Sequence, residues 1–161
     1  PQRGKWQKYV GTLRRRIAGY VRALDEAGLR IDGDVVRLTE CEVDEDGGRT
    51  GFRRLWRRGT RPTAIVAMSD VIALGALEAA LETGLRLPDN LSIVGFDDIP
   101  EAAWVRPALT TIRQPAAEKG ATATELLVRL VNKEDVSRHV VLETRLIDRQ
   151  SIADIARSTP L

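Results

Sequence analysis

Two pairs of polar residues, Ser69-Asp70 and Asp97-Asp98, come directly after short runs rich in Val, Ile and Ala. These runs, Thr63 to Met68 and Leu91 to Phe96, have the length and composition of buried strands in a parallel sheet. Side chains at the carboxyl ends of parallel strands face a crevice, where they can contact a ligand. An ionised carboxylate there accepts strong hydrogen bonds from hydroxyl groups. The sequence therefore predicts a ligand site at one edge of a sheet.

The segment between the two runs predicts a helix over Val71 to Thr83. Asp70 is placed to cap its start, and Gly84 is placed to end it. A strand, helix, strand unit makes its strands parallel, so both strand ends lie at one edge. The apolar stripe of this helix, which by default packs on the sheet, comprises Leu74, Leu77 and Leu81.

The rest of the chain continues this alternation, which favours the α/β class, with a parallel sheet and flanking helices. Its 161 residues are most simply one domain. Further helices are predicted over Arg14 to Ala27, Thr50 to Arg58 and Ala116 to Val131, and further extended segments over Val35 to Thr39, Leu109 to Gln114 and His139 to Ile147.

Charge is unevenly distributed along the chain. Residues 1–61 hold 15 Lys and Arg against 9 Asp and Glu, whereas residues 62–161 hold 10 against 14. Seven basic residues and no acidic one precede Asp25. Together with Trp6 and Tyr9, this basic segment could bind phosphates and stack on bases, although an ordinary solvated terminus explains it better.

Several linked motifs resemble one family. The segments MSDVIALGALEA, GLRLPDNLSIVGFDDIP and PALTTIRQP are similar to the effector-binding core of LacI/GalR-family transcriptional regulators, whose fold is shared with periplasmic sugar-binding proteins. Upstream, RRIAGY followed by Ala23-Leu24 resembles the arginine, glycine, aromatic helix of that family. The resemblance extends in order over about residues 12 to 150. It implies a three-layer lobe of the periplasmic-binding-protein type, related to the Rossmann fold.

The resemblance also implies how the chain is divided. Family members carry a helix-turn-helix headpiece and then two lobes, and the matches here begin within the second lobe. We therefore expect the headpiece and most of the first lobe to be absent, and operator DNA to be bound only through that headpiece. The expected parts are a basic N-terminal segment (1–13), the main βα lobe (14–112), a crossover strand and helix (113–135), and a returning strand with a C-terminal tail (136–161).

The family pattern assigns ligand contacts to five positions. Arg16 matches the arginine that commonly reaches the ligand, with Arg14 and Arg15 as alternatives, and its guanidinium could bridge neighbouring hydroxyls. Asp97 is expected to accept ligand hydrogen bonds, whereas Asp98 is expected to serve the turn. The other three candidates are Ser69, where many members have Asn; Gln114, at the end of the crossover strand; and Asp46, in a loop that lies over the pocket in the family.

A homodimer is expected by the same resemblance. Family members dimerise partly through the helix equivalent to 71–83 and the loop after the FDD segment. Apolar residues of the crossover helix would lack their usual partner, so we expect that helix to fold back on the lobe or to pair with another chain. The candidate interface residues are Leu74, Leu77, Leu81, Ile99 and Trp104; those of the crossover helix are Leu126, Leu127, Leu130 and Val131.

A metal site is not expected. Glu42-x-Asp44-x-Asp46-Gly47 imitates the first half of a calcium loop. The twelfth position is Arg53, where a calcium loop requires a bidentate Glu. We therefore predict neither a metal nor a cofactor.

Catalysis finds little support in the sequence. The single histidine, His139, is far along the chain from the single cysteine, Cys41. Ser69, Asp97 and His139 could in principle form a triad, but nothing around them indicates an activated nucleophile. A lone cysteine fits a reducing cytoplasm, no apolar run approaches the length that spans a bilayer, and we recognise no signal-peptide pattern, so we expect a cytoplasmic protein. We therefore do not expect an enzyme.

The function that these features favour is the effector-sensing part of a LacI-type regulator, responsive to a sugar or another small polar metabolite. A sugar-binding receptor of a transport system would use the same fold. A truncated remnant that folds without binding an effector is the third possibility.

Overall fold

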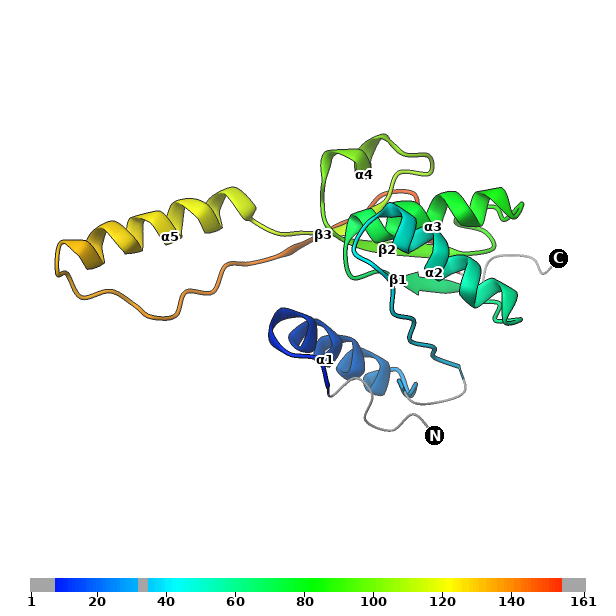
Figure 1. Cartoon of the computed structure of the whole chain (residues 1–161), viewed down its shortest axis with the longest axis horizontal. Coiled ribbons are helices and arrows are strands. Elements are labelled where there is room, and N and C mark those ends of the chain that lie inside the picture. Colours follow the sequence, from blue (N-terminus) through cyan, green and yellow to red (C-terminus); the bar gives the residue numbers. More distant parts are fainter. Residues whose placement is uncertain (1–7, 32–34, 155–161) are drawn as a thin grey trace.

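The computed structural model of the chain describes residues 8–31 and 35–154 (Figure 1). From β1 onward, strands and helices alternate as the α/β pattern predicts. The elements are, in order, α1 (Gly11–Glu26), α2 (Glu45–Arg57), β1 (Ala64–Val66), α3 (Asp70–Glu82), β2 (Ser92–Asp97), α4 (Pro100–Trp104), β3 (Thr110–Arg113), α5 (Ala116–Val131) and β4 (Arg145–Ile147).

The sheet has four strands in the order β1-β2-β3-β4. The predicted parallel arrangement is confirmed for the first three, with Val66 opposite Val94 and Asp97 opposite Arg113. The fourth strand is antiparallel to β3, so one antiparallel strand completes the otherwise parallel sheet. The chain leaves β3 through α5 and returns directly alongside β3, and such a return needs no crossover over a face of the sheet.

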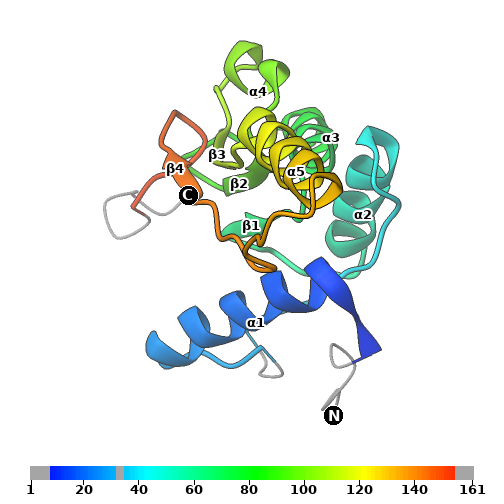
Figure 2. The same cartoon turned by 90° about the vertical axis from the view of Figure 1, so that its left-hand side faces the viewer.

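The core lies between the sheet and helix α3. Leu77, Leu91, Ile93 and Leu109 are at most 1 % exposed. Ala73, Ala79 and Ala80 of α3 are also fully buried, which allows this helix to lie close to the strands. Helix α1 lies on the opposite side of β1 from α3 (Figures 1 and 2).

Helices α2 and α3 pack against each other through glycines. A Cβ atom at Gly75 would lie 1.8 Å from the carbonyl oxygen of Glu45, and one at Gly48 would lie 2.1 Å from that of Ile72. Neither position therefore accepts a larger residue at the present separation of the helices. Ion pairs from Arg49 to Glu78 and from Arg53 to Glu82 join the exposed sides of the pair, and the side-chain oxygen and nitrogen of the second pair lie 2.6 Å apart.

The start of one predicted helix and the existence of one predicted strand were wrong. Helix α2 starts at Glu45, not at Thr50, because the Asp44 carboxylate accepts a hydrogen bond from the Gly47 N–H and caps it. The segment Val35 to Thr39, predicted as a strand, forms no strand and pairs with none in the described part of the chain.

The start of α3 and the ends of the later segments also differ from prediction. Ser69, not Asp70, is the N-cap residue of α3, while Gly84, with φ of 81°, follows the helix as expected. Only residues 145–147 of the predicted strand His139 to Ile147 pair with the sheet. Helix α4, at 100–104, was not predicted.

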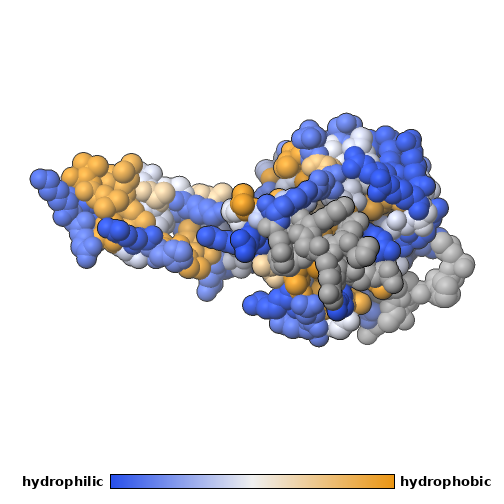
Figure 3. Space-filling model, turned by 60° about the horizontal axis from the view of Figure 1, so that its bottom comes forward, coloured by the Kyte–Doolittle hydropathy of each residue, from blue (hydrophilic) through white to orange (hydrophobic). Residues whose placement is uncertain are grey.

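Helix α5 and the segment returning from it form an arm that extends away from the sheet (Figures 1 and 2). No residue of α5 is buried, so of the two expected alternatives the helix does not fold back on the lobe, and pairing with another chain stays a prediction. Leu127, Val128, Leu130 and Val131 are each more than half exposed, and apolar side chains gather along the arm (Figure 3). No helix among residues 8–31 and 35–154 is long and apolar enough to cross a membrane.

Candidate functional site

Arg16 of α1 reaches the carboxyl edge of the sheet. Its guanidinium carbon lies 3.7 Å from the centre of the Phe96 ring, and its Nη1 donates a hydrogen bond to the carbonyl oxygen of Met68, at 2.5 Å. Met68 follows β1 and Phe96 lies in β2, so α1 is held across the ends of both strands. The ring and the carbonyl fix the guanidinium in place while leaving its side chain 20 % exposed.

Asp97, the last residue of β2, faces this guanidinium. Its Oδ1 lies 3.8 Å from Nη2 of Arg16 and accepts a hydrogen bond from Nε2 of Gln114, at 2.5 Å. Lys119 in the first turn of α5 donates from Nζ to Oε1 of Gln114, also at 2.5 Å. Four residues from α1, β2, the β3–α5 link and α5 therefore form one polar cluster: Arg16, Asp97, Gln114 and Lys119.

The polar cluster unites three of the five predicted ligand residues and adds one that was not predicted. Lys119 was missed because its position depends on how α5 leaves the sheet after Gln114. Its spacing of five residues from Gln114, across Pro115 and the start of a helix, was the only signal available in the sequence.

Ser69 directly follows Met68, whose carbonyl oxygen accepts the hydrogen bond from Arg16 of the polar cluster. It is 7 % exposed and is the N-cap residue of α3. Its Oγ has no hydrogen-bond partner in the described part of the chain. A buried hydroxyl without a partner is unfavourable, so a polar group entering here would be stabilised.

Asp46, the fifth predicted ligand residue, lies in the first turn of α2 with its side chain 79 % exposed. Its carboxylate pairs with Arg49 of the same helix, at 3.5 Å. The structure does not bring Asp46 into contact with the polar cluster. The acidic segment around it provides the cap and first turn of α2, and residues 8–31 and 35–154 hold no group of side chains suited to a metal ion.

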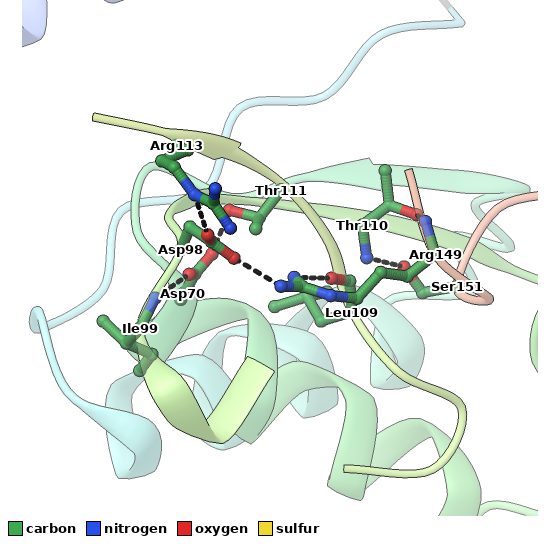
Figure 4. Close-up of polar contacts among 9 residues, drawn as sticks. All are labelled: Asp70, Asp98, Ile99, Leu109, Thr110, Thr111, Arg113, Arg149 and Ser151. Carbon is green, nitrogen blue, oxygen red and sulfur yellow. Dashed lines mark hydrogen bonds and ion pairs between the residues drawn. The ribbon is translucent and has the colours of Figure 1, made fainter. Parts of the chain in front are cut away.

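The residue after Asp97 has a different environment. The Asp98 side chain is 6 % exposed, and it lies between the guanidinium groups of Arg113 and Arg149 (Figure 4). Nε of Arg113 donates to Oδ2 at 2.5 Å, and Nη2 of Arg149 donates to Oδ1 at 2.6 Å. Burial alone would raise the pKa of the Asp98 carboxyl, but these hydrogen bonds together with the two positive charges bring the pKa below its ordinary value. We refer to Asp98, Arg113 and Arg149 as the Asp98 clamp.

Asp70 also departs from its predicted role as a helix cap. Its carboxylate is fully buried and accepts hydrogen bonds from the Ile99 N–H, at 3.0 Å, and from the Thr111 hydroxyl, at 2.5 Å (Figure 4). It passes over Gly95, where a Cβ atom would lie 2.1 Å from Oδ1. Asp70 thereby ties the start of α3 to both the loop after β2 and strand β3.

The family of the periplasmic binding protein-like domain matches residues 8–152. The chain belongs to this family. The HTH-type transcriptional repressor PurR of Salmonella arizonae is 36 % identical over 140 residues, which are 86 % of this chain and 40 % of that protein. The domain described here therefore spans less than half the length of that curated relative.

Solved structures agree with this assignment. A LacI-type transcription regulator from Bifidobacterium animalis superimposes with a TM-score of 0.82 at 30 % identity, over 92 % of this chain and 53 % of that one. A LacI family regulator from Enterococcus faecium, solved with bound ribose, gives 0.78 at 31 % identity, over 86 % of this chain and 50 % of that one. These relatives are all transcriptional regulators.

The five candidate interface residues differ in their exposure within this periplasmic-binding-protein-like domain. Trp104 is 71 % exposed at the end of α4, and Leu81 is 41 % exposed on α3. Leu74 and Ile99 are half-buried against the core, and Leu77, at 1 % exposure, belongs to the core itself. Trp104 and Leu81 are thus the two that offer most surface to a partner.

The residues considered for catalysis do not meet. His139 is exposed on the segment returning from α5, whereas Ser69 is buried and Asp97 is paired with Gln114. No hydrogen bond joins the three within the described ranges. Cys41 is half-buried, and burial raises the pKa of its thiol, so it lacks the thiolate character of a nucleophile.

Two basic regions lie away from the polar cluster. Of the N-terminal segment, Trp6 is outside the described residues, while Tyr9 and Lys8 both bind the carboxylate of Glu40. The second region is a hollow of about 480 Å³ at the end of α2. It is lined by Thr50 and by four arginines: Arg53, Arg54, Arg57 and Arg58. Two of them are bound to protein acceptors, Arg53 to Glu82 and Arg54 to the Glu40 carbonyl.

Proposed function

We propose that this chain is the effector-binding part of a LacI-type transcriptional regulator that responds to a sugar or a related small polar metabolite. The observation that carries the proposal is the polar cluster at the carboxyl edge of the sheet. There Arg16, Asp97 and Gln114 come together from segments that are far apart in sequence. The regulator relatives favour this function over a receptor of a transport system.

Each residue of the site would have a distinct role toward a hydroxylated ligand. Asp97 would accept hydrogen bonds from two neighbouring hydroxyls, because a carboxylate has several acceptor positions. Arg16, already oriented by the Phe96 ring, would donate to ring or hydroxyl oxygens. The unpaired Oγ of Ser69 could both donate and accept.

Gln114 and Lys119 would connect the ligand to the arm. Gln114 lies between the end of β3 and α5, and Lys119 lies within α5. A ligand hydroxyl that replaces the Gln114 contact to Asp97 would change the hydrogen bonding at the point where the arm begins. Such a differential contact is what an effector needs in order to favour one conformation of a regulator over another.

We further infer that the regulator acts in the cytoplasm as a homodimer, with Trp104 and Leu81 in the interface. DNA binding would belong to a helix-turn-helix that relatives carry in addition to this region. The whole regulator would then couple effector binding to operator affinity.

The test is a thermal-shift screen of the chain against sugars, sugar phosphates and nucleosides. A ligand at one hundred times its dissociation constant adds about 2.7 kcal/mol to the unfolding free energy, which raises the melting temperature by several degrees. We expect a selective shift in the wild type that is lost in Asp97→Ala.

The matched control is Asp148→Ala, which removes an exposed carboxylate next to β4. This variant should keep the full shift. A folded chain that shows no shift with any member of the panel at millimolar concentration would contradict the proposal that this chain binds the effector. A shift that persists in Asp97→Ala would contradict the role of Asp97.

A further inference from the structure

The backbone is strained where the site begins. Asp97 has φ of 126° and Asp98 has φ of 61°, although neither is glycine. The Cβ atom of an L residue is crowded at positive φ, most severely near the value at Asp97. Such a conformation persists only where the surrounding structure imposes it.

The Asp98 clamp holds the second of these residues. Arg113 and Arg149 bind the two oxygens of the Asp98 carboxylate at 2.5 and 2.6 Å (Figure 4). Arg149 is itself fixed, because its Nη1 donates to the Leu109 carbonyl at 2.7 Å and its backbone N–H donates to the Thr110 hydroxyl at 2.9 Å. The clamp therefore anchors the loop after β2 to β3 and to the residues following β4.

Anchors on either side leave Asp97 little freedom. Before it, β2 pairs with β3 up to Arg113, which lies opposite Asp97 itself. After Asp98, the Ile99 N–H donates to the buried carboxylate of Asp70 at 3.0 Å. The two residues must complete the turn between fixed ends, and they do so at positive φ.

We propose that Asp98 and Arg149 are positioning residues, which hold the backbone of Asp97 in its strained conformation and so aim the Asp97 carboxylate at the polar cluster. Neither residue contacts the ligand. The inference deepens the proposed function in that Asp97 serves ligand binding, but the strain that the clamp imposes is measurable without any ligand.

A purely structural ion-pair cluster would behave differently. It would stabilise the fold by the same amount whatever residue occupied position 97. A positioning clamp predicts instead that position 97 prefers glycine over alanine, and that this preference depends on the clamp. Alanine and glycine both lack the carboxylate, so the contacts to Arg16 and Gln114 cancel in the comparison.

The experiment is a set of six unfolding curves in urea, for Asp97→Gly and Asp97→Ala in the wild-type, Asp98→Asn and Asp148→Asn backgrounds. We expect the folding equilibrium constant of Asp97→Gly to exceed that of Asp97→Ala by about tenfold, the reverse of the usual order of these residues. In an Asp98→Asn background, the ratio should fall to about threefold or less, because Asn accepts positive φ but does not hold both guanidinium groups as a carboxylate does.

Asp148→Asn is the control background, since it removes an equal charge from an exposed residue one position before Arg149. The tenfold ratio should persist there. The proposal would be overturned if the ratio of the folding equilibrium constants of Asp97→Gly and Asp97→Ala were the same in the Asp98→Asn and Asp148→Asn backgrounds.

The wild type and the single variants Asp98→Asn, Arg149→Lys and Asp148→Asn are then tested with D-ribose by calorimetry. If the wild-type chain binds D-ribose, Asp98→Asn and Arg149→Lys should weaken binding at least about tenfold while remaining folded, and Asp148→Asn should not change it. Unchanged affinity in both clamp variants would overturn the positioning role. If the wild type binds neither D-ribose nor any panel ligand, the proposed function fails for this chain, and the unfolding curves still decide whether the clamp imposes the strain.

Discussion

Asp97 and Asp98 are neighbours of the same residue type, yet their carboxylates have different surroundings. The Asp97 side chain is 34 % exposed and faces Arg16 and Gln114, whereas that of Asp98 is 6 % exposed between two arginines. The sequence predicted both at the end of a strand and assigned the turn to Asp98. It could not predict the clamp, because Arg149 lies 51 positions away and comes close only when the chain returns along β3.

The Asp98 carboxyl makes stability depend on pH. Its folded pKa lies below the ordinary value of 3.8, because the hydrogen bonds from Arg149 and Arg113 outweigh the effect of burial. A depressed pKa stabilises the fold above the unfolded pKa, and this stabilisation is lost as pH falls through the folded value. We expect Asp98→Asn to lower the unfolding free energy by about 3 kcal/mol at pH 7, and by progressively less below about pH 4.

Urea unfolding of the wild type and Asp98→Asn at pH 7, 5, 4 and 3 measures this difference. Asp148→Asn, with the same change of charge on the surface, should differ little from the wild type throughout that range. A difference for Asp98→Asn that stays constant from pH 7 to pH 3 would contradict the assigned cause.

At the scale of the elements, the close approach of α2 and α3 depends on Gly75. A Cβ atom there would meet the Glu45 carbonyl oxygen, which belongs to the backbone and cannot move without displacing α2. Gly75→Ala should therefore lower the unfolding free energy by about 3 kcal/mol or more. Gly120→Ala on α5, where nothing lies within 4 Å, should raise it by about 0.5 to 1 kcal/mol, because alanine favours a helix.

Chemical denaturation of the two variants makes this comparison directly. Two glycine-to-alanine changes in helices would then have effects of opposite sign. If the two variants changed the unfolding free energy equally, α2 and α3 would have to be farther apart at Gly75 than the structure shows.

The accuracy of the sequence-based prediction differs between elements for physical reasons. Helix α3 and strand β2 were predicted within a residue or two, since each has a strong apolar pattern and both are buried by elements close in sequence. The start of α2 was missed because Gly47 and Gly48 disfavour helix. The close approach of the Glu42 backbone requires glycine at the first position, and packing against α3 requires it at the second. The strand predicted over Val35 to Thr39 did not form, because a strand needs a neighbour to pair with and a local sequence pattern does not show whether one is present.

The candidate site shows a similar division. Asp97 and Ser69 were predicted because they follow strands that the sequence makes evident, and Arg16 and Gln114 because the family resemblance named them. That resemblance also named Asp46, which the structure leaves on the surface of α2. Lys119 depends on the direction in which α5 leaves the sheet, and only the fold gives that direction.

For the whole molecule, Trp104 is the residue whose exposure most calls for a partner. Exposed tryptophans are strongly enriched among the residues that dominate interface energies. If Trp104 lies in the proposed dimer interface, Trp104→Arg should weaken dimerisation by about 30-fold or more, which corresponds to at least 2 kcal/mol. Sedimentation equilibrium over micromolar concentrations measures this constant.

Trp104→Phe, which keeps an aromatic ring on the same surface, is the matched control and should remain largely dimeric. A wild-type chain that sediments as a monomer at tens of micromolar would contradict the proposed dimer. A dimerisation constant that is unchanged in Trp104→Arg would mean that the interface does not include Trp104.

The segment that follows β4 decides when the chain can complete its fold during synthesis. Ser151 is fully buried, its Oγ accepts from the Thr110 N–H and donates to the Ile93 carbonyl, and its carbonyl accepts from the Ile93 N–H. Ile93 and Ser151 are 58 positions apart, with α4, β3, the whole arm and β4 between them. A nascent chain thus leaves the Ile93 backbone without its Ser151 partner until Ser151 has left the ribosome, and chaperones have that interval in which to bind the incomplete sheet.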